Sequence, residues 1–164
     1  MAEQYRIRAF KPGDRDRLHE IREAAFRPVF RSFREIVGKK IASIAMVNAE
    51  KEQAELLDKI CKDDSSYDLL IIEHAGEVVG FCGLKLDNKT KVGEIELVAV
   101  HPDQQGKGLG TALNEAALDF MRKAGMRVVT VGTGGDPSHA AARRSYEKAG
   151  FGPTIPSVWM FRTL

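Results

Sequence analysis

The chain has 164 residues, of which 43% are hydrophobic and 29% charged, which predicts one folded domain over residues 1–164 and excludes a disordered chain. A net charge of +2 is too small to indicate a nucleic-acid partner by itself. The N-terminal residues resemble no signal peptide, and no apolar run reaches the length of a membrane span. Because two cysteines, Cys61 and Cys82, are too few for a disulfide scaffold, we expect a cytoplasmic protein without a membrane partner.

Charge is distributed unevenly over the first half of the chain. Residues 1–40 carry a net charge of +5, and residues 41–76 carry −5. Two solvated helix faces would explain this pattern, and the alternative is a surface that selects a charged acceptor. A nucleic-acid surface would need aromatic side chains interleaved with the basic ones, and the basic segment lacks a sizeable surface of this kind. We therefore predict no nucleic-acid partner.

The first part of the chain predicts a strand followed by helices. Tyr5–Phe10 alternates in polarity and ends in turn residues, which is typical of a strand. Asp14 through Phe26 carries apolar side chains at helical spacing, and Pro28 is expected to interrupt this helix. A second helical stretch follows, for which Ser32 or Ser43 could provide the N-cap.

The middle of the chain predicts a meander of strands. Tyr67–Glu73 and Val78–Leu86 are separated by a short segment that contains a glycine, which is typical of a hairpin. Val92–Val100 is the next predicted strand. Consecutive strands joined by short turns pair antiparallel, so we expect a mostly antiparallel central sheet.

The last third alternates between helices and strands. Apolar residues recur at helical spacing between Leu109 and Met121, and Gly125 is the expected C-cap. The remaining predicted elements are a strand at Arg127–Val131, a helix at Ser138–Ala149 and a last strand at Val158–Phe161. The order of all elements predicts a mixed α/β domain whose central sheet is flanked by helices.

The segment that joins the strand Val92–Val100 to the next helix carries the clearest functional pattern. Glycines stand at every second position, at Gly106, Gly108 and Gly110, immediately before an amphipathic helix. Glycines let the backbone approach a ligand, and the first amides of a helix have no partner within it. The pattern predicts a site for an anion such as a pyrophosphate.

Two well-known phosphate motifs do not fit this glycine loop. The P-loop pattern fails because His101 occupies the position of its first glycine. The dinucleotide pattern fails because Leu113 occupies the position of its third glycine.

Two longer motifs do fit one family. Residues 105–110 match the pattern Gln/Arg-x-x-Gly-x-Gly/Ala, and residues 144–151 contain Tyr-Glu-Lys-x-Gly-Phe. In these motifs, which together cover roughly residues 76–152, the chain resembles the GNAT superfamily of acyl-CoA-dependent N-acetyltransferases. The resemblance implies a sheet in which the strand before the glycine loop splays from the next strand around the cofactor. The first 65 residues carry no comparable signature.

The resemblance also implies acetyl-CoA as cosubstrate. Backbone groups of two valines would pair with the pantetheine arm, and amides from Gln105 through Thr111 would hold the pyrophosphate. His139 stands where the family often has an asparagine that contacts the cofactor, and helix capping is the alternative. Basic residues, Arg144 among them, are candidates for the 3′-phosphate or are solvated charges. The predicted cofactor-binding residues are Val98, Val100, Gln105, Gly106, Lys107, Gly108, Gly110, Thr111, His139 and Arg144.

Three side chains are candidates for proton transfer. Glu94 and Glu96 lie two residues apart in a predicted strand, so we expect them to share one face. By its position relative to the family's catalytic glutamate, Glu94 is the preferred base and Glu96 the alternative, although both could be solvated surface residues. Tyr146 stands at the position of the family's proton donor, and ring packing at a helix end is its alternative. The four scattered histidines predict no metal site.

The sequence thus favours an enzyme, an N-acetyltransferase that transfers an acetyl group from acetyl-CoA to a primary amine by direct attack in a ternary complex. The alternative is a non-catalytic acyl-CoA-binding regulatory module. The acceptor, a small molecule or a protein amine, is not identified by the sequence, and a homodimer is left open.

Overall fold

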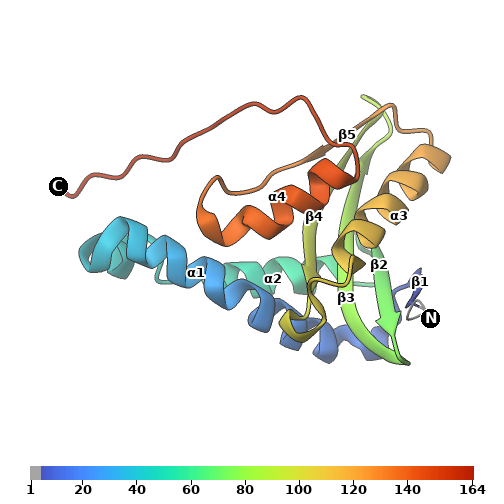
Figure 1. Ribbon diagram of the computed structural model, residues 1–164, viewed down its shortest axis with the longest axis horizontal. Helices are drawn as coiled ribbons and strands as arrows, with labels where there is room; N and C mark the ends of the chain where they lie inside the picture. Colours follow the sequence, from blue (N-terminus) through green and yellow to red (C-terminus); the bar gives the residue numbers. More distant parts are fainter. Residues whose placement is uncertain (1–4) are drawn as a thin grey trace.

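The computed structural model describes residues 5–164 and contains one five-stranded sheet in the order β1-β2-β3-β4-β5 (Figure 1). The first three strand pairs are antiparallel and the pair β4–β5 is parallel, so the predicted mixed, mostly antiparallel α/β class is confirmed. The strands are β1 (Tyr5–Ala9), β2 (Tyr67–His74), β3 (Glu77–Asp87), β4 (Val92–Val100) and β5 (Val128–Val131). The α-helices are α1 (Arg15–Ala45), α2 (Ala49–Ile60), α3 (Leu109–Lys123) and α4 (Ala140–Lys148), and short 3-10 helices span Pro12–Asp14, Pro102–Gln104 and Pro137–His139.

Helices cover both faces of the sheet, and each face has its own hydrophobic core. Neighbouring residues of β3 point to opposite sides, so Phe81 lies in the core under α1 and α2 while Cys82 lies in the core under α3. Burial raises the pKa of the Cys82 thiol to about 12, so this thiol is protonated and inert at neutral pH. In the part of the chain covered by residues 5–164, no helix combines the length and apolar character needed to cross a membrane.

Helix α1 is longer than the sequence predicts. The prediction that Pro28 interrupts it is wrong, because the helix continues on both sides of the proline, where side chains pack against the sheet and line a cleft. The break in its geometry comes later, at Gly38, whose φ of 80° and ψ of 163° are not helical. Neither predicted serine caps the second helix: Ser32 and Ser43 both lie within α1, and Asn48 is the N-cap residue of α2.

The C-terminal segment, residues 151–164, has no regular secondary structure, so the predicted strand at Val158–Phe161 is wrong. Figure 1 shows this segment leaving α4 and running towards the far end of α1 rather than along β5. Two prolines, Pro153 and Pro156, precede the predicted strand and supply no N–H groups to a ladder. The apolar side chains of the segment are used differently, since the Trp159 ring lies 6.5 Å from that of Phe33 in α1.

Candidate active site

A cleft of about 1350 Å³ opens beside β4 and is lined by residues from four helices, β4, β5 and the C-terminal segment. One part of its wall comes from residues 102–110 and from α3 and α4, and we call it the glycine-loop end. The other part comes from α1, α2 and Val158–Phe161, and we call it the α1 end. Residues 95–100 of β4 line the cleft between these two ends.

The backbone of the glycine loop is shaped by two left-handed residues. Gly106 has φ 79° and Gly108, the N-cap residue of α3, has φ 80°, a conformation that costs a residue with a Cβ roughly 1–2 kcal/mol. The amide of Ala112 donates to the Gly108 carbonyl oxygen over 3.0 Å, which closes the first turn of α3. Amides ahead of that turn have no acceptor within the helix, and the helix dipole adds positive potential there. The geometry suits an anion such as a pyrophosphate.

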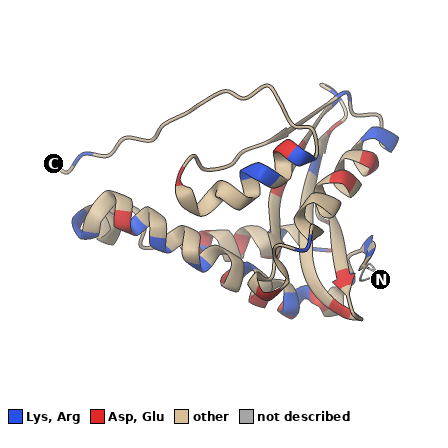
Figure 2. Cartoon of the chain, viewed as in Figure 1, with Lys and Arg blue, Asp and Glu red and all other residues tan. Residues whose placement is uncertain are grey.

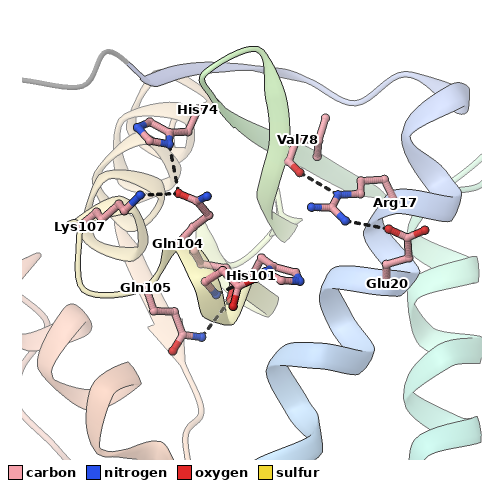
Figure 3. A network of polar contacts seen from close by, with 10 residues as sticks. Arg17, Glu20, His74, Val78, His101, Gln104, Gln105 and Lys107 are labelled. Carbon is pink, nitrogen blue, oxygen red and sulfur yellow. Dashed lines mark hydrogen bonds and ion pairs between the residues drawn. The ribbon is translucent and has the colours of Figure 1, made fainter.

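Side chains hold this loop in place. Gln105 Nε2 donates to the Val100 carbonyl oxygen over 2.9 Å and so ties the loop to the end of β4 (Figure 3). Lys107 Nζ donates to Gln104 Oε1 over 2.9 Å, and His74 Nδ1 lies 3.1 Å from the same oxygen. Figure 3 shows these contacts joining the loop to the end of β2. Gln105 and Lys107, both predicted cofactor contacts, therefore also stabilise the loop through hydrogen bonds within the protein.

Strand β4 contains a bulge at the centre of the cleft. Leu84 of β3 pairs with Ile95 and Gly83 pairs with Leu97, which leaves Glu96 as an extra residue. Ile95 lies in the core under α3 and Leu97 in the core under α1 and α2, so the alternation that would place Glu94 and Glu96 on one face is interrupted. Glu96 lines the cleft, whereas Glu94 is exposed outside its lining.

The pairing of β4 with β5 ends early. The last registered pair joins Ile95 to Val131, while β4 continues to Val100. From Glu96 onward the edge of β4 has no strand partner on this side within residues 5–164 and lines the cleft. Here lie Val98 and Val100, whose backbone groups are predicted to meet a pantetheine arm. This is the expected splayed strand pair.

Tyr146 of α4 lines the cleft with 7% of its surface exposed. Its ring contacts that of Phe151 edge to face, with centroids 5.7 Å apart. Burial raises the pKa of the Tyr146 phenol above its usual value, so the group is protonated at neutral pH. The two interpretations of this residue, ring packing and proton donation, are therefore compatible.

His139 belongs to a polar group that joins α1 to the start of α4. Its Nδ1 lies 2.5 Å from Asp136 Oδ1, and its ring stacks on that of Phe33 at 5.6 Å. Asp136 also accepts hydrogen bonds from Ser32 Oγ, over 2.8 Å, and from the Ser138 amide, over 3.1 Å. Burial alone would raise the pKa of Asp136, but the hydrogen bonds from Ser138, Ser32 and His139 outweigh it and hold the pKa well below its usual range. His139 lines the cleft from this fixed position.

Sequence reasoning missed the contacts that two polar residues of this region make. Asp136 could have been recognised from its position before Pro137-Ser138, a typical helix-cap pattern. No sequence pattern marks Asn114 as a residue of the cleft. It is a buried residue of α3 whose Nδ2 donates to Ser145 Oγ over 3.1 Å. Within the described chain its Oδ1 has no hydrogen-bond partner, although the residue lines the cleft.

The basic residues at the glycine-loop end differ in their roles. Arg143 Nη1 donates to the carbonyl oxygens of Gly134 and Asp136, over 2.5 and 2.9 Å, so it holds the loop before α4. Arg144 and Lys148 line the cleft and are placed to meet an anionic ligand. Among residues 5–164, no cluster of three His, Cys, Asp or Glu side chains could hold a metal ion.

Comparison with known proteins gives the family of this molecule. The sequence model of the acetyltransferase (GNAT) family matches residues 16–151. The chain therefore belongs to the acetyltransferase (GNAT) family of acyltransferases. Its fold is similar to that of a GNAT-family acetyltransferase from Desulfovibrio desulfuricans, with a TM-score of 0.69, 21% identity, and coverage of 93% of this chain and 87% of the other. A GNAT-family acetyltransferase from Brucella melitensis, solved in complex with acetyl-CoA, has a TM-score of 0.62 and 26% identity, covering 94% and 92% of the two chains.

Curated relatives are named mycothiol acetyltransferase. The protein from Sanguibacter keddieii is 42% identical over 98 residues, which cover 57% of this chain and 30% of the relative. The protein from Stackebrandtia nassauensis is 33% identical over 150 residues, which cover 88% of this chain and 44% of the relative. The chain thus spans less than half the length of these two relatives.

Proposed function

We propose that the protein transfers an acetyl group from acetyl-CoA to a primary amine. The observation that carries this proposal is one continuous cleft that begins at a left-handed glycine loop, follows the splayed edge of β4 and reaches a buried tyrosine. Family membership and the relative solved with acetyl-CoA support the same cosubstrate. The acceptor is not taken from the mycothiol acetyltransferases, because the chain matches less than half of their length.

The residues of the cleft suit the parts of coenzyme A in turn. The first amides of α3 would hold the pyrophosphate, and Arg144 with Lys148 would meet the 3′-phosphate. Backbone groups of Val98 and Val100 would bond the amide groups of pantetheine along the edge of β4, as an added strand does. With the cofactor bound in this way, the thioester would lie near Tyr146 and the bulge at Glu96.

The reaction forms one bond and breaks one bond. The amine nitrogen attacks the thioester carbonyl carbon, the new C–N bond forms, and the C–S bond breaks to release the coenzyme A thiolate. The acceptor binds as an ammonium ion and loses two protons: a carboxylate of β4 would take the first through water before the attack, and the second leaves to water as the amide forms. One proton must reach the thiolate, and Tyr146 supplies it. Of the two candidate bases, Glu94 is favoured by the resemblance and Glu96 by its position in the cleft.

Two measurements test the proposed function. Coenzyme A should raise the melting temperature, because a ligand that binds only the folded state stabilises it by mass action. Purified protein with acetyl-CoA should release free thiol when a primary amine is added. No thermal shift at millimolar coenzyme A would refute the proposal. Binding without turnover on any amine would instead support the non-catalytic acyl-CoA-binding module.

Glu94→Gln and Glu96→Gln form a matched pair that assigns the base. An amine with a pKa near 10 is almost wholly protonated at neutral pH, so a base is most useful there. We expect Glu96→Gln to lower the rate at pH 7 by about 10²-fold, with partial recovery at high pH where free amine is abundant. The reverse result, a slow Glu94→Gln enzyme and a normal Glu96→Gln enzyme, would return the role to Glu94. If neither change matters, positioning and solvent carry the proton.

A further inference from the structure

The α1 end of the cleft carries a stripe of aromatic side chains. Phe26, Phe30 and Phe33 recur at helical spacing and all line the cleft. The Phe26 and Phe30 rings lie 6.4 Å apart, and Trp159 from the C-terminal segment lies 6.5 Å from Phe33. The three half-buried phenylalanine rings and the exposed Trp159 ring form a wall that extends away from the glycine-loop end.

The segment that brings Trp159 to this wall is itself apolar. Apart from Arg162, residues 151–164 carry no charged side chain (Figure 2). Val158 and Met160 line the cleft beside Trp159. The α1 end is therefore bordered on two sides by apolar groups from distant parts of the chain, those of the C-terminal segment being largely exposed, and such a surface favours a ligand with an apolar body.

The charged side chains of the α1 end and of the neighbouring bulge of β4 carry an excess of negative charge. Arg34 Nη2 lies 2.5 Å from Glu50 Oε2, and its guanidinium lies 6.0 Å from the centre of the Phe30 ring. The Glu50 carboxylate therefore neutralises the positive charge of Arg34. Two further acidic residues, Glu52 and Glu96, line the cleft. One ammonium group would be attracted here by these carboxylates and by the aromatic faces.

Resting on the proposed function, we propose that the acceptor is a small arylalkylamine, a primary ammonium group carried on an aromatic body. The aromatic body packs against the wall formed by Phe26, Phe30 and Phe33, and the ammonium group points towards Glu96 in the bulge of β4. A polyamine or an aminoglycoside carries several separated charges, which the aromatic wall leaves without partners.

Steady-state kinetics with matched amines test this proposal. With acetyl-CoA saturating, kcat/KM for 2-phenylethylamine should exceed that for ethanolamine by at least about tenfold, because the ring is removed from water. Spermidine and kanamycin should be poorer acceptors than 2-phenylethylamine. A preference for spermidine, kanamycin or a peptide with a free N-terminal alanine would overturn the proposal, and so would equal rates with ethanolamine.

Phe30→Leu and Phe120→Leu provide the matched variants. Leucine keeps an apolar side chain but removes the aromatic face, so Phe30→Leu should raise KM for 2-phenylethylamine by about three- to tenfold. The KM for acetyl-CoA should not change. Phe120, on α3, packs against the core outside the cleft, so Phe120→Leu should leave the preference among amines unchanged.

The two proposals fail differently in these experiments. If the wild-type protein does not bind acetyl-CoA, the proposed function is refuted. If it binds acetyl-CoA and acetylates amines other than arylalkylamines, only the acceptor class is refuted. An unchanged KM for 2-phenylethylamine in Phe30→Leu would also refute the aromatic wall as the acceptor site.

Discussion

The two ends of the cleft are built in different ways. At the glycine-loop end, backbone amides and left-handed glycines form the candidate anion site, within one short stretch of sequence. At the α1 end, side chains form the wall, and they come from α1, α2 and the C-terminal segment. A site made of backbone groups leaves a compact pattern of glycines in the sequence, whereas a site made of scattered side chains leaves none. The comparison explains why coenzyme A could be predicted and the acceptor could not.

The largest effect is expected at the backbone of the glycine-loop end. Gly108→Val places a β-branched residue at φ 80°, a conformation that such residues rarely adopt. We expect the thermal shift caused by coenzyme A to disappear while the circular dichroism spectrum is retained. Gly13→Val is the control, because Gly13, in the 3-10 helix Pro12–Asp14, has no positive φ and open space for an added side chain. Binding that survives Gly108→Val would mean that the pyrophosphate lies elsewhere.

The next effect concerns the proton donor. Tyr146→Phe keeps the ring that packs on Phe151 and removes the hydroxyl group, so turnover should fall by about 10²–10⁴-fold with little change in acetyl-CoA binding. Since burial raises the pKa of Tyr146, the wild-type rate should not fall between pH 7 and 10 through loss of this proton. Tyr67→Phe on β2 is the matched control. An unchanged turnover rate in Tyr146→Phe would show that this residue contributes only by packing.

A smaller effect is expected at the contact between the two ends. Asp136→Asn keeps the shape of the side chain but removes the negative charge of the carboxylate that Ser32 and His139 contact. We expect this change to lower the free energy of unfolding at pH 7 by about 2 kcal/mol. Because the folded pKa of Asp136 is depressed, its contribution is present above about pH 4 and is lost as the pH falls below the unfolded value. The variant and the wild type should therefore converge in stability progressively, starting as the pH falls below about 4 and continuing towards the depressed folded pKa.

Urea unfolding at several pH values measures this convergence. Asp63→Asn is the control, since Asp63 is an exposed loop residue. A constant difference between Asp136→Asn and the wild type from pH 7 to pH 3 would show that the charge does not matter. The hydrogen bonds alone would then join α1 to α4.

The smallest effect is expected inside the glycine-loop end, at Asn114. Leucine has a similar volume and removes the carbonyl oxygen that is buried without a partner in residues 5–164. Such a group costs about 1–3 kcal/mol, so Asn114→Leu should raise the melting temperature by about 3 °C. Ser145→Ala, which removes the partner of Nδ2 instead, should not raise it. A lower melting temperature in Asn114→Leu would show that water or another group satisfies this oxygen.

The elements that local pattern determines were predicted well from the sequence. The hairpin of β2 and β3 turns through Ala75 and Gly76, both with positive φ, and Gly125 ends α3 with φ 83°. The strand Val92–Val100 has its predicted bounds. In each case a turn residue or a repeating apolar pattern determines the structure within a few residues.

The features that tertiary contacts determine were not predicted. Pro28 lies inside α1 because packing on both sides offsets the lost hydrogen bond, and the bulge at Glu96 appears only when β4 is aligned with β3. Val158–Phe161 has the apolar composition of a strand but packs beside α1. Asp136 and Ser32 are far apart in the sequence, so no local pattern could place them in one network.

The position of Trp159 gives the molecule a built-in optical signal. It is the only tryptophan of the 164-residue chain, and its indole lines the cleft with 79% of its surface exposed. Indole emission shifts to shorter wavelength when water around the ring is replaced by apolar groups. Intrinsic fluorescence therefore reports on the α1 end alone, without a label and without interference from a second tryptophan. An amine that binds at the α1 end should therefore shift the emission of the unmodified protein, whereas a ligand confined to the glycine-loop end should leave it unchanged.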